Sequence, residues 1–252
     1  MKRAAAYSAL PCAALLAWVT WATAQQAAGR AAIMPSDVVA GAATLAMTGM
    51  PPGHTLPWHV GYSLWRVAIG FGTAALLGVP LGLLSASSPT MNRVVRPIID
   101  FLRPIPPLAW VPLAIAWFGI GVSAAAFIIF LGAFFPIVVS TCAGVSHVPP
   151  AYVQVARSFR ARDHQIWLGV LIPAALPSIV TGLRVSLGVA WMTLVAAEFT
   201  DVREGYGLGY MLMAARDLQR LDAVVAGMAC IGLIGWLLDL ALRRLGAAVA
   251  RS

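Results

Sequence analysis

A basic, amphipathic segment between Val148 and Arg184 carries the clearest functional pattern in this sequence. It opens with Pro149 and Pro150, which end the preceding apolar run and suit the first turn of a new helix. On a helix from Ala151, apolar residues recur at i, i+3, i+4 and i+7, which places on one stripe Tyr152, Val155, Ala156 and Phe159. The basic residues off that stripe are Arg157, Arg160 and Arg162. Such a helix can fill a groove in a partner protein or lie on lipid headgroups, and the pattern alone favours neither.

The second half of this segment leads back toward an apolar region. Asp163 can cap a second short helix, which continues through Pro173 and Pro177 into a long apolar run. We therefore expect two short helices at one membrane face, the first of which carries the apolar stripe.

Patterns that would support catalysis or metal binding are absent from the sequence. It contains no HExxH, GxSxG or GxxxxGK[ST] motif, and its only lysine is Lys2. The histidines are scattered, and the cysteines lie inside apolar runs without metal-binding or CxxC spacing. These residues are His54, His59, His147 and His164, and Cys12, Cys142 and Cys230. We predict no catalytic residue, metal site or cofactor in this chain.

The composition indicates an integral membrane protein. Of the 252 residues, 60% are hydrophobic and 10% are charged, whereas soluble domains carry about a quarter charged residues. A chain of this kind cannot hide its apolar surface in its own core, so the bilayer must be its solvent. The net charge of +8 does not indicate nucleic-acid binding, because the basic residues are dispersed beside apolar runs, as the positive-inside rule describes.

Six apolar runs are predicted to cross a bilayer, whose hydrocarbon core takes about 20 helical residues. They cover approximately residues 4–24, 60–86, 105–120, 124–145, 177–197 and 223–242. The first run follows Met1-Lys2-Arg3 and ends at Ala22-Thr23-Ala24, which also fits a cleaved secretory signal. We favour a retained first span, and either alternative leaves the following segment outside. That segment is expected to hold one short helix near Ser36 to Met47, with Ser36 as its N-cap.

The basic residues set the orientation of these spans. Of the 17 lysines and arginines, eleven lie on one side and four on the other, and the richer side is predicted to be cytoplasmic. The cytoplasmic set is Lys2, Arg3, Arg93, Arg96, Arg103, Arg157, Arg160, Arg162, Arg243, Arg244 and Arg251, and the external set is Arg30, Arg203, Arg216 and Arg220. Both termini are then cytoplasmic. The chain is divided into an N-terminal helix with an external segment (1–55) and a transmembrane domain (56–245), which carries a cytoplasmic loop at 146–172.

The segment between Val148 and Arg184 resembles the signature cytoplasmic loop of the permease subunits of ABC importers. The family motif reads Glu-Ala-Ala, three residues, Gly, nine residues, Ile, one residue, Leu-Pro. The corresponding positions here are Gln154-Val155-Ala156, Arg160, Val170 and Ile172-Pro173. Gln154 lacks the charge of the family's glutamate, and Arg160 stands where glycine tolerates a positive φ. Either this turn is built differently, or the helix pair is tilted from the family norm.

The resemblance extends over roughly Leu56 to Leu242 and points to one branch of these permeases, which serves uptake of nitrate, aliphatic sulfonates, taurine and related small anions. The runs that carry it are Ser63–Arg66, Gly70-Phe71, Gly78–Gly82, Leu102–Gly121, Gly132–Pro136, Ala174–Ser178, Thr181–Arg184, Glu198 and Gly207–Tyr210.

This resemblance implies an all-α, polytopic membrane protein with the type I ABC importer permease fold, in which five core helices follow an N-terminal helix. It also implies a bacterial inner-membrane location, a second permease copy in a homodimer, two ATPase subunits that bind ATP, and an external substrate-binding protein. The coupling helix would lie at about Ala151 to Phe159. The residues that contact or position the ATPase would be Tyr152, Gln154, Val155, Ala156, Phe159, Arg160 and Pro173.

Three further sites are weighed against simpler explanations. Glu198, Gly207 and Gly209, with Gly205, could form a flexible external gate or docking loop, or an ordinary connecting turn. Arg184 lies inside an apolar run and could face an anion path, but snorkelling or pairing with Asp239 is favoured. Arg66, near the outer end of its span, is expected to reach the membrane interface.

Two other functions are kept as alternatives to the importer subunit. A self-sufficient secondary transporter or channel often shows inverted repeats and charged residues in mid-membrane, and neither is prominent here. An intramembrane enzyme needs a catalytic set facing one cavity, and none can be read from the sequence.

Overall fold

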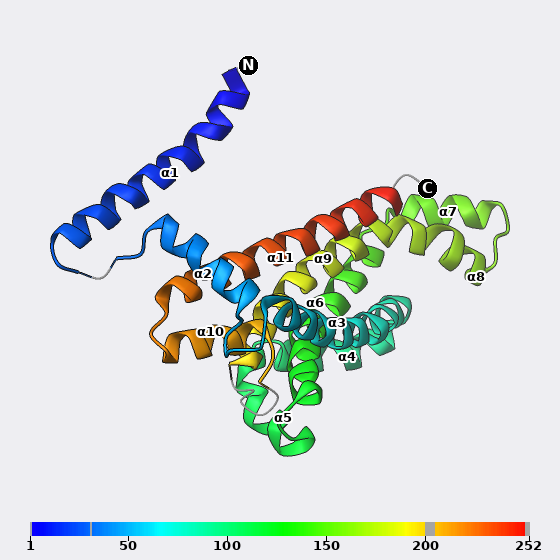
Figure 1. Cartoon of the computed structure of the whole chain (residues 1–252). Helices are drawn as coiled ribbons and strands as arrows, with labels where there is room; N and C mark the ends of the chain where they lie inside the picture. The colour runs from blue at the N-terminus through cyan, green and yellow to red at the C-terminus, as the bar shows by residue number, and fades with distance from the viewer. Residues whose placement is uncertain (1, 31, 200–204, 250–252) are drawn as a thin grey trace. The chain divides into compact units, whose positions relative to one another are not determined.

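The computed structural model describes residues 2–30, 32–199 and 205–249, which form helices joined by short connections, with no strand among them (Figure 1). The chain divides into two compact units. The first comprises residues 1–59 and 211–231, and the second comprises residues 60–210 and 232–252.

The first unit contains helices α1 (Lys2–Ala27) and α2 (Pro35–Met47), most of α10 (Leu208–Asp217), and the first residues of α3 (Leu56–Ser87) and α11 (Leu221–Val249). The expected short helix near residues 36–47 is present as α2, but its N-cap is Met34, not Ser36. Pro35 takes the first helical position, and the carboxylate of Asp37 accepts the Met34 N–H at 2.8 Å. The sequence prediction put the cap two residues late, because a proline that suits the first turn precedes Ser36.

The core of the second unit is the pair α6 (Val122–Ser146) and α9 (Ile172–Glu198). Figure 1 shows these helices running alongside each other. Their close approach depends on small residues, since a Cβ added at Gly144 would lie 2.7 Å from Ser178 Cβ, and one added at Gly182 would meet Ser140. Small residues at a helix contact let the backbones approach closely, which is the usual way membrane helices pack.

Helix α4 (Pro89–Leu102) corrects the prediction of a cytoplasmic loop at residues 87–104. It follows α3 (Leu56–Ser87) directly and packs Ile99 against Leu131, Phe135 and Val138 of α6. After a short break, the chain forms the 3₁₀ helix η1 (Pro107–Trp110) and α5 (Val111–Phe118). The predicted third span at residues 105–120 is thus too short to cross a membrane alone, and it is joined to α4 as a pair bent by 86°.

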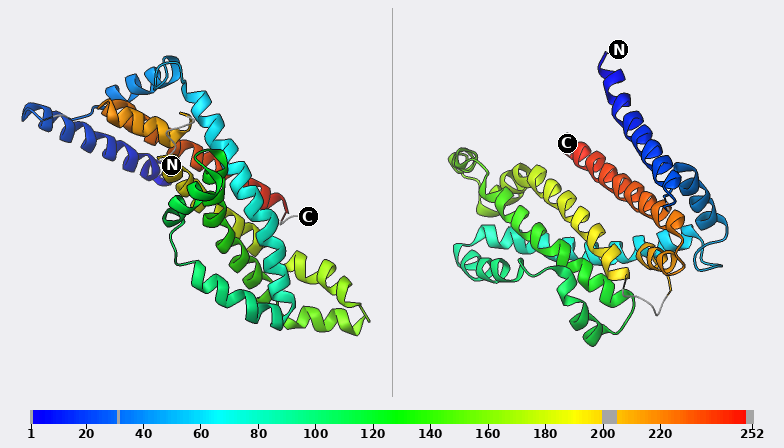
Figure 2. Two further views of the ribbon diagram at one scale, coloured as in Figure 1. Left: turned by 90° about the horizontal axis from the view of Figure 1, so that it is seen from below. Right: turned by 90° about the vertical axis from the view of Figure 1, so that its left-hand side faces the viewer.

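The segment after α6 forms a hairpin of α7 (Pro150–Ser158) with α8 (Asp163–Ile166) and the π-helix η2 (Trp167–Leu171). Figure 2 shows this hairpin extending past the ends of α6 and α9. The expected second short helix is present as α8 and, as predicted, leads into the long apolar run. Together, α8, η2 and α9 form a continuous helical stretch of 36 residues from Asp163 to Glu198. Helix α10 (Leu208–Asp217) then precedes α11.

Four helical stretches in the described part of the chain are long and apolar enough to cross a membrane, or five if the bent pair counts as one span. The four stretches are Leu56–Ser87, Val122–Ser146, Asp163–Glu198 and Leu221–Arg244. These agree with the predicted second, fourth, fifth and sixth spans, and the bent pair replaces the third. Helix α1 is not among them, so its role as a first span stays a prediction.

Candidate functional site

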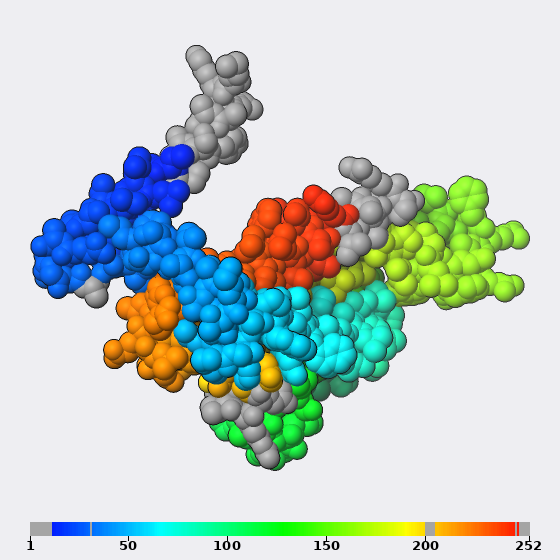
Figure 3. Space-filling view, viewed as in Figure 1, coloured from blue at the N-terminus to red at the C-terminus, as the bar shows by residue number. Residues whose placement is uncertain are grey.

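The first candidate site is the outer face of α7. Pro149 at its N-cap and Pro150 in its first turn begin the helix, as the sequence predicts. The stripe residues Tyr152, Val155 and Phe159 are 55%, 57% and 83% exposed, which is unusual for large apolar side chains. Figure 3 shows the hairpin projecting from one end of the second unit, with its surface uncovered on the face in view. An exposed, ordered apolar stripe of this kind is typical of a protein contact.

Ala156 and Gln154, two further predicted coupling residues, lie on different faces of α7. Ala156 lies on the stripe and is half-buried, whereas Gln154 is exposed off the stripe. The Gln154 carbonyl accepts a hydrogen bond from Ser158 Oγ at 3.1 Å. Pro173 stands apart from this group, because it lies in the first turn of α9, beyond η2. The structure therefore brings six of the seven predicted coupling residues into one helix and its following turn.

The turn after α7 answers the question raised by Arg160. Its φ is 57°, so it adopts the left-handed conformation that glycine would favour. The Arg160 N–H donates to Arg157 O at 2.9 Å, and the Ala161 N–H donates to Ala156 O at 3.1 Å. These two bonds are those of a Schellman motif, in which a left-handed residue closes the helix. The turn is built in the glycine geometry, with arginine carrying a cost of about 1–2 kcal/mol.

The start of α8 differs from the prediction in one detail. Asp163 is the first residue of the helix, and Arg162 is the N-cap. The cap bond runs from the Arg162 N–H to Gln165 Oε1 at 2.8 Å. Gln165 thus supplies one of the two hydrogen bonds of a capping box, in which its side chain accepts from the backbone N–H of the N-cap residue.

The second candidate site is a buried polar cluster around Glu198, at the end of α9. Ser63 Oγ lies 2.7 and 3.0 Å from the two carboxylate oxygens, Arg66 Nη1 donates to Oε1 at 3.1 Å, and the Gly209 N–H donates to Oε2 at 2.8 Å. The Leu208 N–H donates to Ser63 Oγ at 2.9 Å. The side chains of Arg66 and Glu198 are fully buried. This cluster ties α3, α9 and the start of α10 together.

The glycines beside Glu198 are required by packing. Gly207 has a φ of 128°, and a Cβ there would lie 2.5 Å from Glu198 Cδ. A Cβ at Gly209 would lie 2.7 Å from Glu198 Cβ. The structure thus brings together the three residues that were predicted as a gate or docking loop. Gly207 and Gly209 let the backbone pack directly against the Glu198 side chain, whereas they were predicted as a source of loop flexibility.

Sequence reasoning was wrong about Arg66 and did not assign a role to Ser63. Arg66 was expected to reach the membrane interface, but it is buried in the ion pair with Glu198. Its Nη1 also donates to Tyr206 O at 3.1 Å. The available signal was the spacing of Ser63 and Arg66, which are three residues apart and therefore lie on one face of a helix.

Arg184 lies away from both sites. It forms an ion pair with Asp239 of α11, and Asp239 also pairs with Arg243 at 2.6 Å. The alternative of pairing with Asp239 is therefore confirmed. A role for Arg184 in an anion path stays a prediction that this geometry does not favour, since Asp239 already engages the guanidinium.

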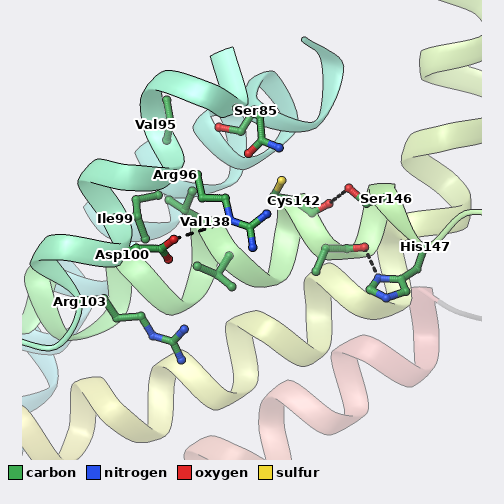
Figure 4. Close-up of a pocket in the computed structure, with 13 residues that line it drawn as sticks. Ser85, Val95, Arg96, Ile99, Asp100, Arg103, Val138, Cys142, Ser146 and His147 are labelled. Atoms are coloured by element: carbon green, nitrogen blue, oxygen red, sulfur yellow. Dashed lines mark hydrogen bonds and ion pairs between the residues drawn. The ribbon is translucent and has the colours of Figure 1, made fainter. Parts of the chain in front are cut away.

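A cavity of about 400 Å³ lies between α3, α4 and α6 and was not foreseen from the sequence (Figure 4). Its polar lining comes chiefly from α4 and from the last turn of α6, and its apolar lining includes Val95, Ile99 and Val138. The polar lining residues are Ser85, Asn92, Arg96, Asp100, Arg103, Ser146 and His147. Because α4 was predicted to be a loop, its side chains were not considered as part of a site. Among the described residues, no group of three His, Cys, Asp or Glu side chains could hold a metal ion.

Comparison with known proteins gives one consistent result. The family described as "Binding-protein-dependent transport system inner membrane component" matches residues 78–252. A protein of Methanocaldococcus jannaschii that is named as an ABC transporter permease is 49% identical over 72% of this chain and 67% of its own length. The taurine transport system permease protein TauC of Escherichia coli is 42% identical, over 76% of this chain and 69% of its own.

The nitrate import permease protein NrtB of a Synechocystis strain is 40% identical, over 70% of this chain and 64% of its own length. The chain thus spans about two thirds of the curated relatives it matches. Among solved structures, the inward-facing MetNI methionine ABC transporter contains a chain with a TM-score of 0.67 at 21% identity. That match covers 76% of this chain and 94% of the other, and at such identity it shows the fold alone.

Proposed function

This chain belongs to the family of inner-membrane components of binding-protein-dependent transport systems, and from that premise we propose that it forms the membrane path of an ATP-driven importer for a small anion. The relatives support the substrate class. Their names refer to taurine, nitrate, bicarbonate and aliphatic sulfonates, which all carry a compact anionic group.

The observation that carries the proposal is the exposed apolar stripe on α7, the first helix of the hairpin. Pro149 fixes one end of α7, and the Schellman turn at Arg160 fixes the other. A short helix held at both ends transmits displacement instead of bending, and the large apolar side chains of its outer face offer a contact that a groove would bury. We propose that this groove belongs to an ATPase subunit, which binds the ATP that this chain has no motif to hold.

The remaining partners follow from the same proposal. Two copies of this chain would enclose the path, and a substrate-binding protein would deliver the anion on the side opposite the hairpin. The hairpin and both termini would face the cytoplasm. In this arrangement, Tyr152, Val155 and Phe159 make the buried part of the ATPase contact, and exposed arginines such as Arg157 and Arg162 surround it with a polar rim.

The test is purification and reconstitution of the transporter. The tagged permease, co-expressed with an ABC ATPase and a binding protein from the same source, is purified in mild detergent and placed in liposomes. We expect the ATPase to co-purify and uptake of taurine, nitrate or bicarbonate to require ATP and the binding protein. Uptake by the permease alone, driven by an ion gradient without ATP, would instead establish a secondary transporter.

A further inference from the structure

The cavity between α3, α4 and α6 is lined by a cation, Arg103, that forms no ion pair within the part of the chain that the structure describes. Arg103 is the C-cap residue of α4 and lies in the break between α4 and η1, within the bent pair that forms a candidate span. Among the described residues, its guanidinium has no hydrogen-bond or ion-pair partner, whereas Arg66 and Arg184 are each paired with a carboxylate. An ionisable residue inside a membrane span is costly and is normally retained for a function.

Arg103 lies at the end of α4 that is farther from α3 along the chain. Helix α4 starts at Pro89, next to the end of α3, and its 14 residues rise about 21 Å before the chain reaches Arg103. Val138, which lines the same cavity, stands about 12 Å along α6 from Ser146 at the helix end.

The charges in the cavity leave a net positive centre. Arg96 is paired with Asp100 at 3.7 Å, so these two side chains largely offset each other. Figure 4 shows Arg103 beyond that pair, at the opposite end of the cavity from His147. Apolar side chains such as Ile99 and Val138 line the wall between them, and a wall of low dielectric strengthens the attraction of a single cation for an anion.

We propose that this cavity is an anion-binding site within the membrane, in which Arg103 binds a planar or tetrahedral oxyanion such as nitrate, bicarbonate or a sulfonate. Guanidinium presents donors in a fork that matches two oxygens of such a group. The amide of Asn92 lines the same cavity and can donate a further hydrogen bond to the anion, whereas the hydroxyls of Ser85 and Ser146 donate to Leu81 O and Cys142 O. The physiological meaning of the site rests on the proposed import function.

Native Cys142 provides a test that needs no transport, because it lines the same cavity. With Cys12 and Cys230 replaced by serine, its modification rate is measured in nanodiscs with an anionic and a cationic methanethiosulfonate reagent. The ratio of the two rates reports the local potential at the cavity. We expect Arg103→Gln to lower the anionic-to-cationic ratio about tenfold, Arg103→Lys to preserve it, and Arg93→Gln, a charge removal on α4 outside the cavity lining, to leave it within about twofold.

Bound anion is detected by protection. At constant ionic strength maintained with gluconate, nitrate and methanesulfonate should slow modification of Cys142 severalfold in the parent protein, and the neutral dimethyl sulfone should not. The protection should vanish in Arg103→Gln and persist in Arg93→Gln. Equal protection in both variants, or none in the parent protein, would overturn the anion site.

The two proposals can fail separately. Loss of protection in Arg103→Gln together with a parent protein that does not couple uptake to ATP would retain the anion site and reject the importer. ATP-dependent uptake by the parent protein, with Cys142 indifferent to anions, would retain the importer and reject the site.

Discussion

Glu198 Oε1 and Arg66 Nη1 lie 3.1 Å apart in an ion pair with both side chains fully buried, although the residues are 132 positions apart in the sequence. The pair joins the end of α9 to α3, and Ser63 and Gly209 supply further hydrogen bonds to the carboxylate. A buried charge is tolerated only when it is paired and hydrogen-bonded, so the cluster has to be kept complete.

Removing the carboxylate should destabilise the protein strongly. Glu198→Ala leaves the buried guanidinium of Arg66 without its counter-charge, and we expect a loss of about 3–5 kcal/mol in the free energy of unfolding. Asp100→Asn is the control, because it removes one partner of an exposed pair and should cost at most about 1 kcal/mol. Denaturant titration in mixed micelles measures both variants. If both variants lose a similar free energy of unfolding, the buried ion pair contributes no more to stability than the exposed one.

The packing of the loop against Glu198 leads to a second prediction. Gly207→Ala places a methyl group 2.5 Å from Glu198 Cδ at a φ of 128°, and we expect a loss of about 2 kcal/mol or more. Gly188→Ala in α9 has open space around its Cβ and should be neutral or stabilising by up to about 1 kcal/mol. The same titration compares the two alanine variants, and a mild Gly207→Ala would mean that the loop can move away from the carboxylate.

The left-handed turn after α7 should respond to backbone freedom. We expect Arg160→Gly to slow hydrogen exchange of the Ala161 amide, since glycine takes a φ of 57° without strain. Arg160→Val should accelerate it severalfold, because a β-branched residue is poorly suited to this region.

Gln219 has a φ of 55° in the first unit and offers a matched position, where glycine should protect the local amides without affecting the α7 turn. Hydrogen exchange followed by mass spectrometry resolves the two segments. If the exchange rate of the Ala161 amide is unchanged in both Arg160 variants, the Schellman geometry of this turn is contradicted.

The proposed ATPase contact predicts the effect of a single charge. Ala156→Asp puts a carboxylate on the stripe, where it would be buried without a partner, and should reduce ATP-driven uptake by at least about tenfold. Ser158→Asp adds the same charge to the same helix away from the stripe and should retain most of the uptake. Both variants are reconstituted with the ATPase, and the amount of ATPase retained on the tagged permease is measured in parallel. An Ala156→Asp transporter that assembles and works at the parent rate would exclude α7 as the coupling element.

Long apolar runs were enough to predict most of the spans, because a helix is the element that satisfies its own backbone in lipid. The same reasoning failed at α4. Pro89, Pro97 and the arginines gave this segment the composition of a loop, yet Pro89 occupies the first turn, and the apolar residues of one face, such as Ile99, pack on α6. An amphipathic helix carries its apolar residues on one face only, so the average hydrophobicity of the segment does not reveal it.

The candidate sites also differ in how far the sequence could predict them, because some are local patterns and others join distant segments. The stripe on α7 is a local pattern, so its members could be named from their spacing. The pair of Arg66 and Glu198 joins distant segments, and no local spacing in the sequence links them. For Arg160 the sequence revealed a conflict with the expected turn, and the structure resolves it because the two hydrogen bonds of the turn offset the cost of a left-handed arginine.

The continuous helical stretch from Asp163 to Glu198 is about 54 Å long at 1.5 Å per residue, and the π-helix η2 and Pro173 lie near its hairpin end. One end of this stretch belongs to the hairpin. The other end carries Glu198, whose carboxylate pairs with Arg66 and accepts hydrogen bonds from Ser63 and Gly209. In the proposed transporter, a displacement of the hairpin would reach the Glu198 cluster along this one stretch, and η2 and Pro173 are the positions where the stretch would bend.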